Sequence, residues 1–185
     1  IRTVRIIGID PGLQATGWGV IASDGSQLKG VSHGIIRTNT RMSDSERLIL
    51  IFEGLQNVIA NHQPETAIVE EIFLKDNPRS ALRLGLARGV AILACGQAQL
   101  ALSEISARKV KQAVTGTGAA DKKQVANMVS RLLGIPPPPS DAADALALAI
   151  ACYQGAAAPK TEAAQMQDGL SAAIEVALQK DRTRT

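Results

Sequence analysis

The stretch IIGIDPG, residues 6–12, constrains the fold of this chain more than any other segment. A largely β-branched run over Val4–Ile9, interrupted by the charged Arg5, ends in an aspartate, and a Pro-Gly turn follows at once. A run of this kind between turn formers predicts a buried strand. Asp10 then lies at the carboxyl end of that strand, where open α/β sheets place their sites. Alternatively, Asp10 only caps the turn made by Pro11 and Gly12, so this stretch alone leaves the function open.

The remainder of the chain alternates between strand and helix patterns. Further strands are predicted over Thr16–Ser23, Leu28–Arg37, Thr66–Phe73 and Leu102–Ile105. Helices are predicted from the Ser43–Glu46 capping box to His62, from Pro78 to about Leu100, after Ser106, around Val125–Leu133, and over Asp141–Tyr153 behind a Ser140 cap. The first three strands have short connections, which favour an antiparallel meander. The fold class is therefore α/β, with a mixed five-stranded sheet and helices on both faces.

Length and composition limit the kind of protein. We expect one domain over residues 1–154 and a tail over residues 155–185, a short helix or disordered, because the tail is rich in Ala, Gln, Lys and Thr. The net charge of +3 mildly favours an anionic partner. Cys95 and Cys152 lie in apolar helical stretches. This position indicates that both cysteines are small, buried apolar side chains and that the protein resides in a reducing compartment. With no signal peptide and no apolar run long enough to cross a bilayer, we expect a cytoplasmic protein.

Four acids occupy positions where a site can form. Asp10 ends the first strand, a glutamate ends the fourth, and Asp141 and Asp144 share one face of the last helix. These acids can also be explained without a functional site. The glutamate can be a solvated strand end, and the two aspartates in the first turn of the helix can complement the helix dipole. The last helix is otherwise apolar, however, so we expect it to pack on the sheet and turn both aspartates toward the strands. Glu70 and Glu71 point to opposite faces of their strand, and spacing alone does not choose between them.

Converging carboxylates repel one another, and a divalent cation relieves that repulsion. Carboxylate ligands without histidine or cysteine suit Mg²⁺ or Mn²⁺. Two such ions about 4 Å apart can hold the attacking and leaving oxygens of an in-line phosphoryl displacement. The four acids therefore predict metal-assisted phosphodiester hydrolysis, with two Mg²⁺ ions in each site and Mn²⁺ able to replace them.

Five segments taken together resemble the RuvC-type Holliday junction resolvases. They are IGIDPG, VEEIFLKDN, ALRLGLARGVA, KVKQAVTGTGAADKKQV and DAADALALAIA, in that order within residues 4–153. The resemblance implies an RNase H-like fold and a homodimer that cuts two opposed strands of a four-way DNA junction, in recombination and repair. It also implies a branch-migration complex of the RuvA/RuvB type as partner and a nucleoid-associated place in the bacterial cytoplasm. The tail lies beyond the resemblance.

The resemblance also assigns roles to single residues. It places the catalytic, metal-binding acids at Asp10, Glu70, Asp141 and Asp144, and leaves Glu71 as a neighbour. Of the residues expected to bind DNA, the resemblance gives Phe73, Lys111 and Lys122, with Lys123 as a substitute for its neighbour Lys122. The basic stretch after Phe73 adds Lys75 and Arg79. Lys122 is expected to act in catalysis as well, because an ammonium there would stabilise charge that develops at the scissile phosphate.

Basic side chains gather in two stretches that flank the acids. They are Lys75, Arg79, Arg83, Arg88, Arg108, Lys109, Lys111, Lys122 and Lys123. Such runs are usually solvated faces, but beside an acidic site they would bind phosphates with steep salt dependence. Phe73 is either a core residue or, in a chain with few aromatics, an aromatic that stacks on bases at an opened crossover.

Gly85 and Gly89, four residues apart, leave one face of their helix bare. That face either packs on the sheet or forms the contact of a C2 dimer, and the sequence leaves both open. A C2 dimer would present two identical sites to a junction of approximate two-fold symmetry, so paired cuts would follow from geometry.

Three other functions compete with this interpretation. Other RNase H-like nucleases, which cut RNA–DNA hybrids or process RNA, share the first acid but lack the ALRLGLARG and DAADALA segments together. Kinase-like ATPases also use a strand–Asp–x–Gly turn, but they need two lobes and a longer chain. A DNA-binding module without activity would have little use for four acids, because acids repel DNA unless a metal is present.

Overall fold

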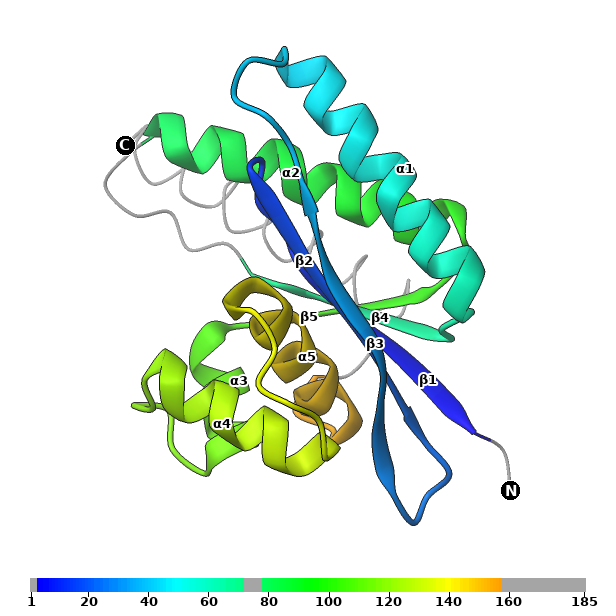
Figure 1. The fold of residues 1–185 in the computed structure, drawn as a ribbon, viewed down its shortest axis with the longest axis vertical. Helices are drawn as coiled ribbons and strands as arrows, with labels where there is room; N and C mark the ends of the chain where they lie inside the picture. Colours follow the sequence, from blue (N-terminus) through cyan, green and yellow to red (C-terminus); the bar gives the residue numbers. More distant parts are fainter. Residues whose placement is uncertain (1–2, 72–77, 158–185) are drawn as a thin grey trace, which may run out of the picture.

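The computed structural model describes residues 3–71 and 78–157 of the chain. Within these residues ten elements follow one another (Figure 1). They are β1 (Val4–Asp10), β2 (Ala15–Ser23), β3 (Leu28–Arg37), α1 (Asp44–His62), β4 (Thr66–Glu70), α2 (Pro78–Gln97), β5 (Ala101–Ile105), α3 (Ala107–Thr115), α4 (Lys122–Leu133) and α5 (Ser140–Tyr153).

The five strands form one mixed sheet in the order β3-β2-β1-β4-β5. The first three strands pair antiparallel, whereas β4 runs parallel to both β1 and β5. The register pairs Asp10 with Gly17 and Glu70 with Ile105, so both acids lie at strand ends on one edge of the sheet. The predicted meander and α/β class are confirmed.

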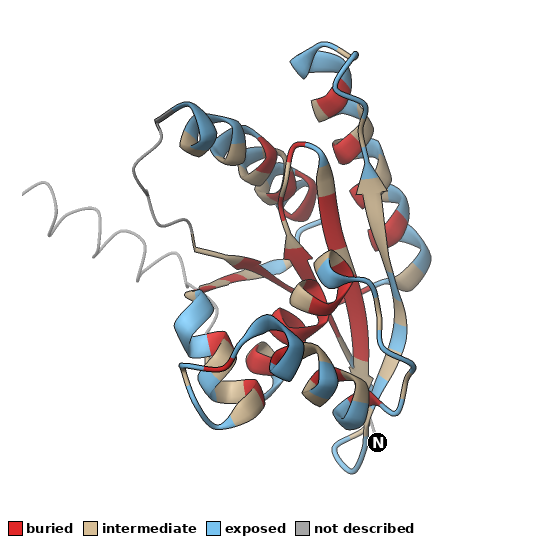
Figure 2. Cartoon of the chain, turned by 60° about the vertical axis from the view of Figure 1, so that its left-hand side comes forward, coloured by how far each residue is buried: buried red, intermediate tan, exposed pale blue. Residues whose placement is uncertain are grey.

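Helices cover both faces of the sheet, with α1 and α2 on one face and α3, α4 and α5 on the other (Figure 1). Alternation along the strands sends Ile7 and Ile9 toward α1 and α2, and sends Ile6 and Ile68 toward α5. Figure 2 shows buried residues concentrated in the central strands. The core is aliphatic, because the largest fully buried side chains are all Ile, Leu or Val.

Glycines in the strands allow α5 to lie close to the sheet. A Cβ at Gly8 would stand 1.9 Å from the carbonyl oxygen of Ala145, and one at Gly17 would stand 2.0 Å from the carbonyl oxygen of Asp141. Neither position can accept a side chain while the helix stays where it is. The glycines therefore set how near α5, and the acids it carries, come to the strand ends.

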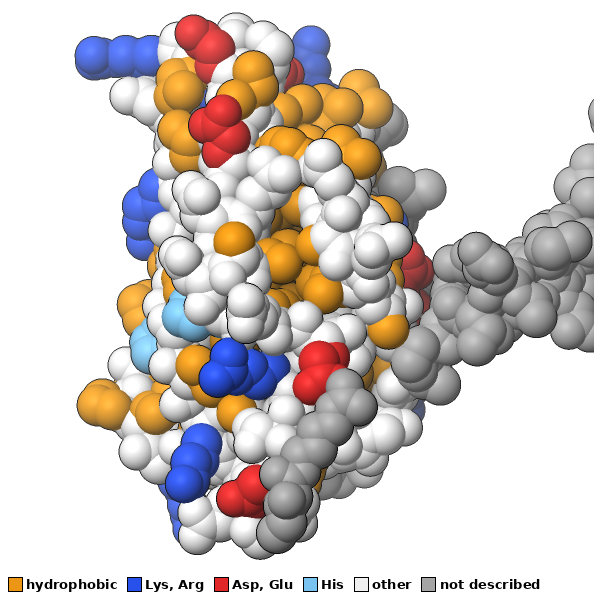
Figure 3. Space-filling model, turned by 90° about the vertical axis from the view of Figure 1, so that its right-hand side faces the viewer, with side chains coloured by type: hydrophobic (Ala, Val, Ile, Leu, Met, Phe, Trp, Pro, Cys, Tyr) orange, Lys and Arg blue, Asp and Glu red, His pale blue; other side chains and the backbone are white. Residues whose placement is uncertain are grey.

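The outward face of α2 has no such neighbour. Added Cβ atoms at Gly85 and Gly89 would meet no described atom within 4 Å. Leu82, Leu86 and Leu93 are 67%, 38% and 60% exposed. Seen from the side in Figure 3, hydrophobic side chains gather in the upper half of the molecule, where α1 and α2 lie in Figure 1. The alternative in which Gly85 and Gly89 pack on the sheet is wrong.

β4 ends earlier than predicted. The prediction was Thr66–Phe73, but the strand covers Thr66–Glu70, Glu71 follows it, and residues 72 and 73 lie outside the described residues. Both neighbouring strands stop at the same level, β5 at Ile105, so the ladder has no partner beyond it. The N–H of Glu71 donates the last hydrogen bond to the carbonyl of Ile105, at 2.9 Å.

α2 also ends earlier, at Gln97 rather than about Leu100. Gln99 adopts a left-handed conformation, with φ of 56°. The N–H of Leu100 then donates to the carbonyl of Cys95 at 3.0 Å, a Schellman-type ending that satisfies the last carbonyls of the helix.

The caps of two later helices differ in detail from the prediction. Ser106 lies at the cap position of α3, but its side chain makes no capping hydrogen bond. Ser140 is the first residue of α5 rather than its cap, and the carbonyl of Pro139 accepts the first helical hydrogen bond from Ala143. Asp144 therefore lies in the second turn of α5, not in the first.

Other local predictions are confirmed. The Ser43–Glu46 capping box forms both of its hydrogen bonds, and β3 has the predicted bounds Leu28–Arg37. Cys95 is buried and Cys152 is partly buried, and both are free thiols. Burial raises the pKa of the Cys95 thiol to about 12. In the described part of the chain, every helix is too short or too polar to cross a membrane.

Candidate active site

Two parallel strands bring Asp10 and Glu70 to the same edge and the same face of the sheet. Asp10 shares its face with Ile6, and Glu70 shares its face with Ile68, and both isoleucines pack beneath α5. Glu70 also lines a pocket together with Asp10. The face of the sheet that α5 covers therefore selects Glu70 over Glu71.

Helix α5 supplies the other two acids. The backbone of Asp141 lies directly against Gly17, the residue that pairs with Asp10 at the end of β1. Asp144, three residues along the helix, lines the same pocket as Asp10 and Glu70, and its side chain is 27% exposed. The structure thus gathers Asp10, Glu70, Asp141 and Asp144, here called the acid cluster, from three elements that are far apart in the chain.

Two members of the acid cluster, Asp10 and Glu70, are harder to ionise than free carboxyl groups. Burial raises the pKa of Asp10 to about 7, and the negative charges of Asp144, Glu70 and Asp141 add to that rise. Burial likewise raises the pKa of Glu70, with a further contribution from Asp144. The positive charge of Lys122 opposes both rises. A bound cation would add positive charge beside these two carboxyl groups and favour their ionised forms.

Lys122 is the cation in direct contact with the acid cluster. Its ammonium donates to Oδ2 of Asp144 at 2.9 Å, and this hydrogen bond together with the charge of Asp144 raises the pKa of Lys122. A capping box between Asp121 and Gln124 begins α4 and makes Lys122 its first residue. The sequence pattern D-x-x-Q signals this start, but the prediction recognised the helix only from Val125.

The pocket beside the acid cluster has a volume of about 270 Å³. Its polar lining comes from Asp10, Glu70, Lys111, Lys122 and Asp144, and the rest of its lining is apolar side chains of α3, α4 and α5. A pocket lined by three acids and two lysines suits a ligand that carries both a metal-binding and an anionic group, as a phosphodiester does.

The donor chemistry of the acid cluster fits Mg²⁺ or Mn²⁺, because every candidate ligand atom is a carboxylate oxygen. Among the residues that the structure describes, no group of three or more acidic, histidine or cysteine side chains is arranged to hold a metal ion as it stands. The ion pair between Lys122 and Asp144 occupies one of the oxygens that a metal would use. Metal binding would therefore require these side chains to adjust.

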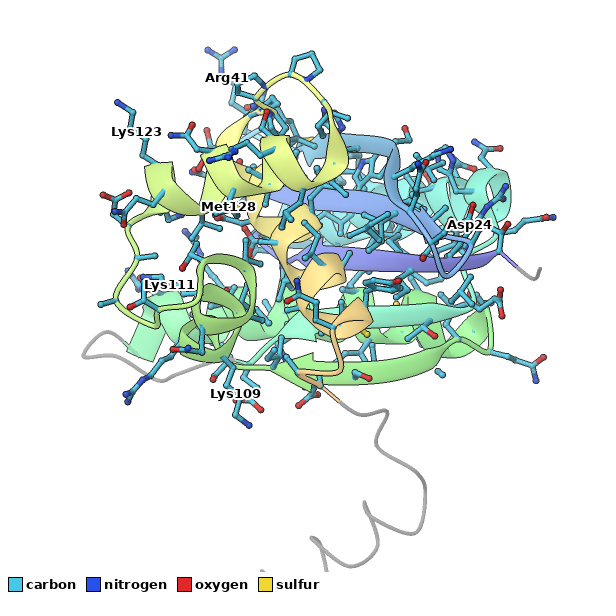
Figure 4. The ribbon with its side chains drawn as sticks, turned by 90° about the horizontal axis from the view of Figure 1, so that it is seen from below. Asp24, Arg41, Lys109, Lys111, Lys123 and Met128 are labelled. Carbon is cyan, nitrogen blue, oxygen red and sulfur yellow. The ribbon has the colours of Figure 1, made fainter. Side chains whose placement is uncertain are left out.

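The predicted DNA-binding residues are only partly brought together. Lys111 and Lys122 line the pocket. Lys123 is exposed and points away from the molecule at the start of α4 (Figure 4). Arg79 is exposed in the first turn of α2. Two further predictions lie outside the described residues, namely Phe73 and Lys75.

Arg88, predicted with the other basic residues to bind phosphate, turns inward instead. Its Nε donates to the carbonyl oxygen of Glu70 at 3.2 Å, and its guanidinium forms an ion pair with Glu104 of β5. These contacts tie α2 to the end of β4 and hold the backbone that carries Glu70. No local pattern marks this role, because it joins three segments that are distant in the sequence.

Comparison with known proteins agrees with the five sequence segments that resemble the RuvC-type resolvases. The family model described as crossover junction endodeoxyribonuclease RuvC matches residues 6–152. A protein with that description from Caulobacter vibrioides is 48% identical over 147 residues, which are 79% of this chain and 87% of the relative. One from Dechloromonas aromatica is 51% identical over 156 residues, 84% of this chain and 87% of the relative.

Solved structures give the same result. The structure described as Thermus thermophilus RuvC in complex with Holliday junction substrate matches with a TM-score of 0.78 and 32% identity, covering 84% of this chain and 99% of that chain. The yeast mitochondrial Holliday junction resolvase matches with a TM-score of 0.60 and 12% identity over 83% of this chain and 79% of its own, which speaks for the fold alone. The predicted RNase H-like fold is confirmed.

Proposed function

Because this chain belongs to the RuvC family of crossover junction endodeoxyribonucleases, we propose that it is a Holliday junction resolvase. It would hydrolyse one phosphodiester bond in each of two opposed strands of a four-way DNA junction. The observation that carries the proposal is the convergence of the four motif acids at one edge of the sheet. The Thermus thermophilus relative, described in complex with Holliday junction substrate, supports the same substrate for this chain.

We further propose that the acid cluster binds Mg²⁺, with Mn²⁺ as a substitute. When bound, two such ions supply Lewis-acid activation of the attacking water and of the leaving oxygen. The chain itself supplies placement: β1 and β4 hold Asp10 and Glu70, and α5 holds the two aspartates against the strand ends. Lys122 is 74% exposed, so it can leave Asp144 and stabilise charge on the scissile phosphate.

The active protein is proposed to be a homodimer that uses the outward face of α2. Leu82, Gly85, Leu86, Gly89 and Leu93 recur at helical spacing and form one exposed stripe, here called the α2 stripe. Leucines give apolar area to bury, and the glycines allow the backbones of two helices to approach closely. A two-fold axis through this stripe would place two acid clusters on one junction.

The cellular setting of the proposal rests on the family alone. Resolvase action belongs to homologous recombination and repair, and a branch-migration complex of the RuvA/RuvB type would deliver the junction. A nucleoid-associated place in the bacterial cytoplasm follows from that role.

The first test is cleavage of a synthetic mobile four-way junction, with a linear duplex and an RNA–DNA hybrid alongside, in Mg²⁺ and with chelator. We expect symmetric nicks in opposed strands of the junction only, and loss of all nicking with chelator. Cutting of the hybrid would instead indicate a ribonuclease, and cutting that persists with chelator would contradict the metal assignment.

Asp10→Asn tests the acid cluster directly. We expect cleavage to fall about 1,000-fold, because loss of a metal ligand removes several kcal/mol of transition-state stabilisation, while junction binding changes little. Asp24→Asn is the matched control, since Asp24 lies in the β2–β3 turn, at the opposite end of the molecule from Lys111 and Lys123 (Figure 4). Equal loss of binding and cleavage in Asp10→Asn would show a structural rather than a catalytic role.

A further inference from the structure

A second hollow adjoins the acid cluster, and it is larger than the pocket lined by Lys111 and Lys122, here called the lysine pocket. It is a groove of about 990 Å³ between the β1–β2 turn, the β3–α1 loop and the start of α2. The residues that matter for its chemistry are Arg37, Thr38, Asn39, Thr40, Arg83 and Asp141. We call it the Arg37–Arg83 groove.

The acid cluster lies between this groove and the lysine pocket. Asp141 lines the groove, whereas Asp144, about one helical turn further along α5, lines the pocket of Lys111 and Lys122. The two hollows are built mainly from different elements. The pocket is lined mainly by α3, α4 and α5, whereas the groove is lined mainly by the β1–β2 turn, the β3–α1 loop and the start of α2. A polymeric ligand such as a nucleic-acid strand that crosses the acid cluster therefore continues into one hollow on each side.

The wall of the groove is held in place by hydrogen bonds within the protein. The N–H of Thr38 donates to the carbonyl of Gln14 at 3.0 Å, and its hydroxyl donates to the carbonyl of Leu13. Arg47, which is only 4% exposed, donates from Nε to the hydroxyl of Thr38 at 2.9 Å. The loop after β3 is thus joined to the turn after Asp10, so the groove and the acid cluster share one rigid support.

The lining of the groove suits a phosphodiester backbone. Arg37 and Arg83 are exposed, and neither forms an ion pair or side-chain hydrogen bond within the described residues. Asn39 and Thr40 add exposed polar side chains between β3 and α1. Guanidinium groups and hydroxyls are the side chains that contact phosphate oxygens in protein–DNA interfaces. Asp141 is the acidic residue among the described lining residues, and it stands at the end that meets the acid cluster.

We propose that the Arg37–Arg83 groove binds backbone phosphates of the cleaved strand, on the side of the scissile phosphate opposite Lys111 and Lys122. Arg37 and Arg83 are positioning residues that hold the strand across the acid cluster. The inference rests on the proposed endonuclease function, and it adds a second anchoring point that the motif lysines alone do not provide.

The first measurement is junction binding without metal, by fluorescence anisotropy at several salt concentrations. We expect Arg37→Ala and Arg83→Ala each to reduce the slope of log affinity against log salt by about 0.7 to 0.9, the loss of one phosphate contact. Arg37→Lys and Arg83→Lys should retain most of the slope, because they keep the charge. Lys29→Ala is the control, since Lys29 is an exposed cation at the other end of the strand that carries Arg37. Alanine variants that behave like Lys29→Ala would overturn the proposal.

The second measurement locates the contact on the strand. Junctions with one neutral methylphosphonate at a time in the cleaved strand are tested for binding by wild type, Arg83→Ala and Lys111→Ala. We expect Arg83→Ala to lose sensitivity to phosphates on one side of the cutting site only, and Lys111→Ala to lose it on the other. Loss on the same side in both variants would overturn the proposed path. A protein that binds the junction with this pattern but never cuts it would contradict the proposed function and leave the groove assignment standing.

Discussion

Helices α5 and α2 lie on opposite faces of the sheet and have similar compositions, rich in alanine and leucine with few charges. In α5, nine of the fourteen residues are buried, because the sheet covers one side and α3 and α4 cover the other. In α2, the buried side is narrow and includes Ala87, Ala91, Ala94 and Cys95. The rest of α2 carries the exposed α2 stripe.

The difference shows that one kind of sequence serves two purposes. An apolar helix that the chain itself covers becomes part of the core, and its two charged residues, Asp141 and Asp144, lie where the strands end. An apolar helix that is covered on one side only leaves area for a second molecule. We therefore propose that α5 serves catalysis, through its two aspartates, and that α2 serves assembly of the dimer.

The largest expected effect is at the contact of α5 with the sheet. Gly8→Ala would place a Cβ 1.9 Å from the carbonyl oxygen of Ala145, so the helix must move. We expect the free energy of unfolding to fall by about 3 kcal/mol or more, measured by urea denaturation. Gly25→Ser offers a contrast at a glycine with no neighbour within 4 Å, where only the φ of 88° is unfavourable, and we expect a smaller loss there. Equal losses would mean that α5 is not closely packed.

The second effect concerns the α2 stripe. Leu82→Glu puts a charge in the proposed dimer contact, and we expect the dimer dissociation constant to rise about 100-fold, or about 2.7 kcal/mol, while the fold persists. Analytical ultracentrifugation over a concentration series measures this change. Ile49→Glu is the matched control, because Ile49 is exposed to a similar extent on α1. If both variants leave the dissociation constant unchanged, α2 is not the interface.

The third effect is a pH dependence of stability that arises at Asp10. Its pKa is about 7 in the folded protein and near 3.8 in the unfolded chain, so between these values the folded state holds a proton that the unfolded state releases. Stability without metal should therefore fall as pH rises from 4 to 7. Asp10→Asn removes this loss, and we expect it to be more stable than wild type by about 2 kcal/mol at pH 8, allowing for screening by solvent.

Thermal unfolding in chelator at pH 5 and pH 8 measures the effect. The difference between Asp10→Asn and wild type should be larger at pH 8, and Mg²⁺ should stabilise wild type more than the variant. A difference that does not change with pH would show that Asp10 is ionised throughout, against the crowding of acids described above.

The smallest expected effect tests whether Gly89 of α2 lies in the proposed dimer contact. Gly89→Ala adds a methyl group that meets no described atom within 4 Å, and alanine favours a helix over glycine by about 1 kcal/mol. We expect the monomer to become that much more stable when measured in the Leu82→Glu background, where the dimer is disrupted. In the otherwise wild-type protein the same change should weaken the dimer, because the methyl group enters the contact. Stabilisation in both backgrounds would place Gly89 outside the interface.

Much of the fold was predictable because its signals are local. The capping box Ser43–Glu46 and the turn residues around Leu28–Arg37 act within a few residues of themselves, and both predictions are confirmed. The start of α4 at Lys122 was missed although its D-x-x-Q signal is local, whereas the end of β4 depends on a distant segment. The strand of Glu70 stops where its neighbour β5 stops at Ile105, and no residue near Glu70 encodes that limit.

By itself the sequence determined the order of elements, the family and, through the motifs of that family, the four acids. The tertiary structure supplied the physical reason that Glu70 and not Glu71 joins Asp10, and only the tertiary structure decided that Arg88 holds the end of β4 and that Arg37 lines a groove beside the acids. The physical reason is the range of the interactions. Capping, alternation and helical spacing act between near neighbours along the chain, whereas faces, pockets and ion pairs depend on which distant segments the packed core brings together.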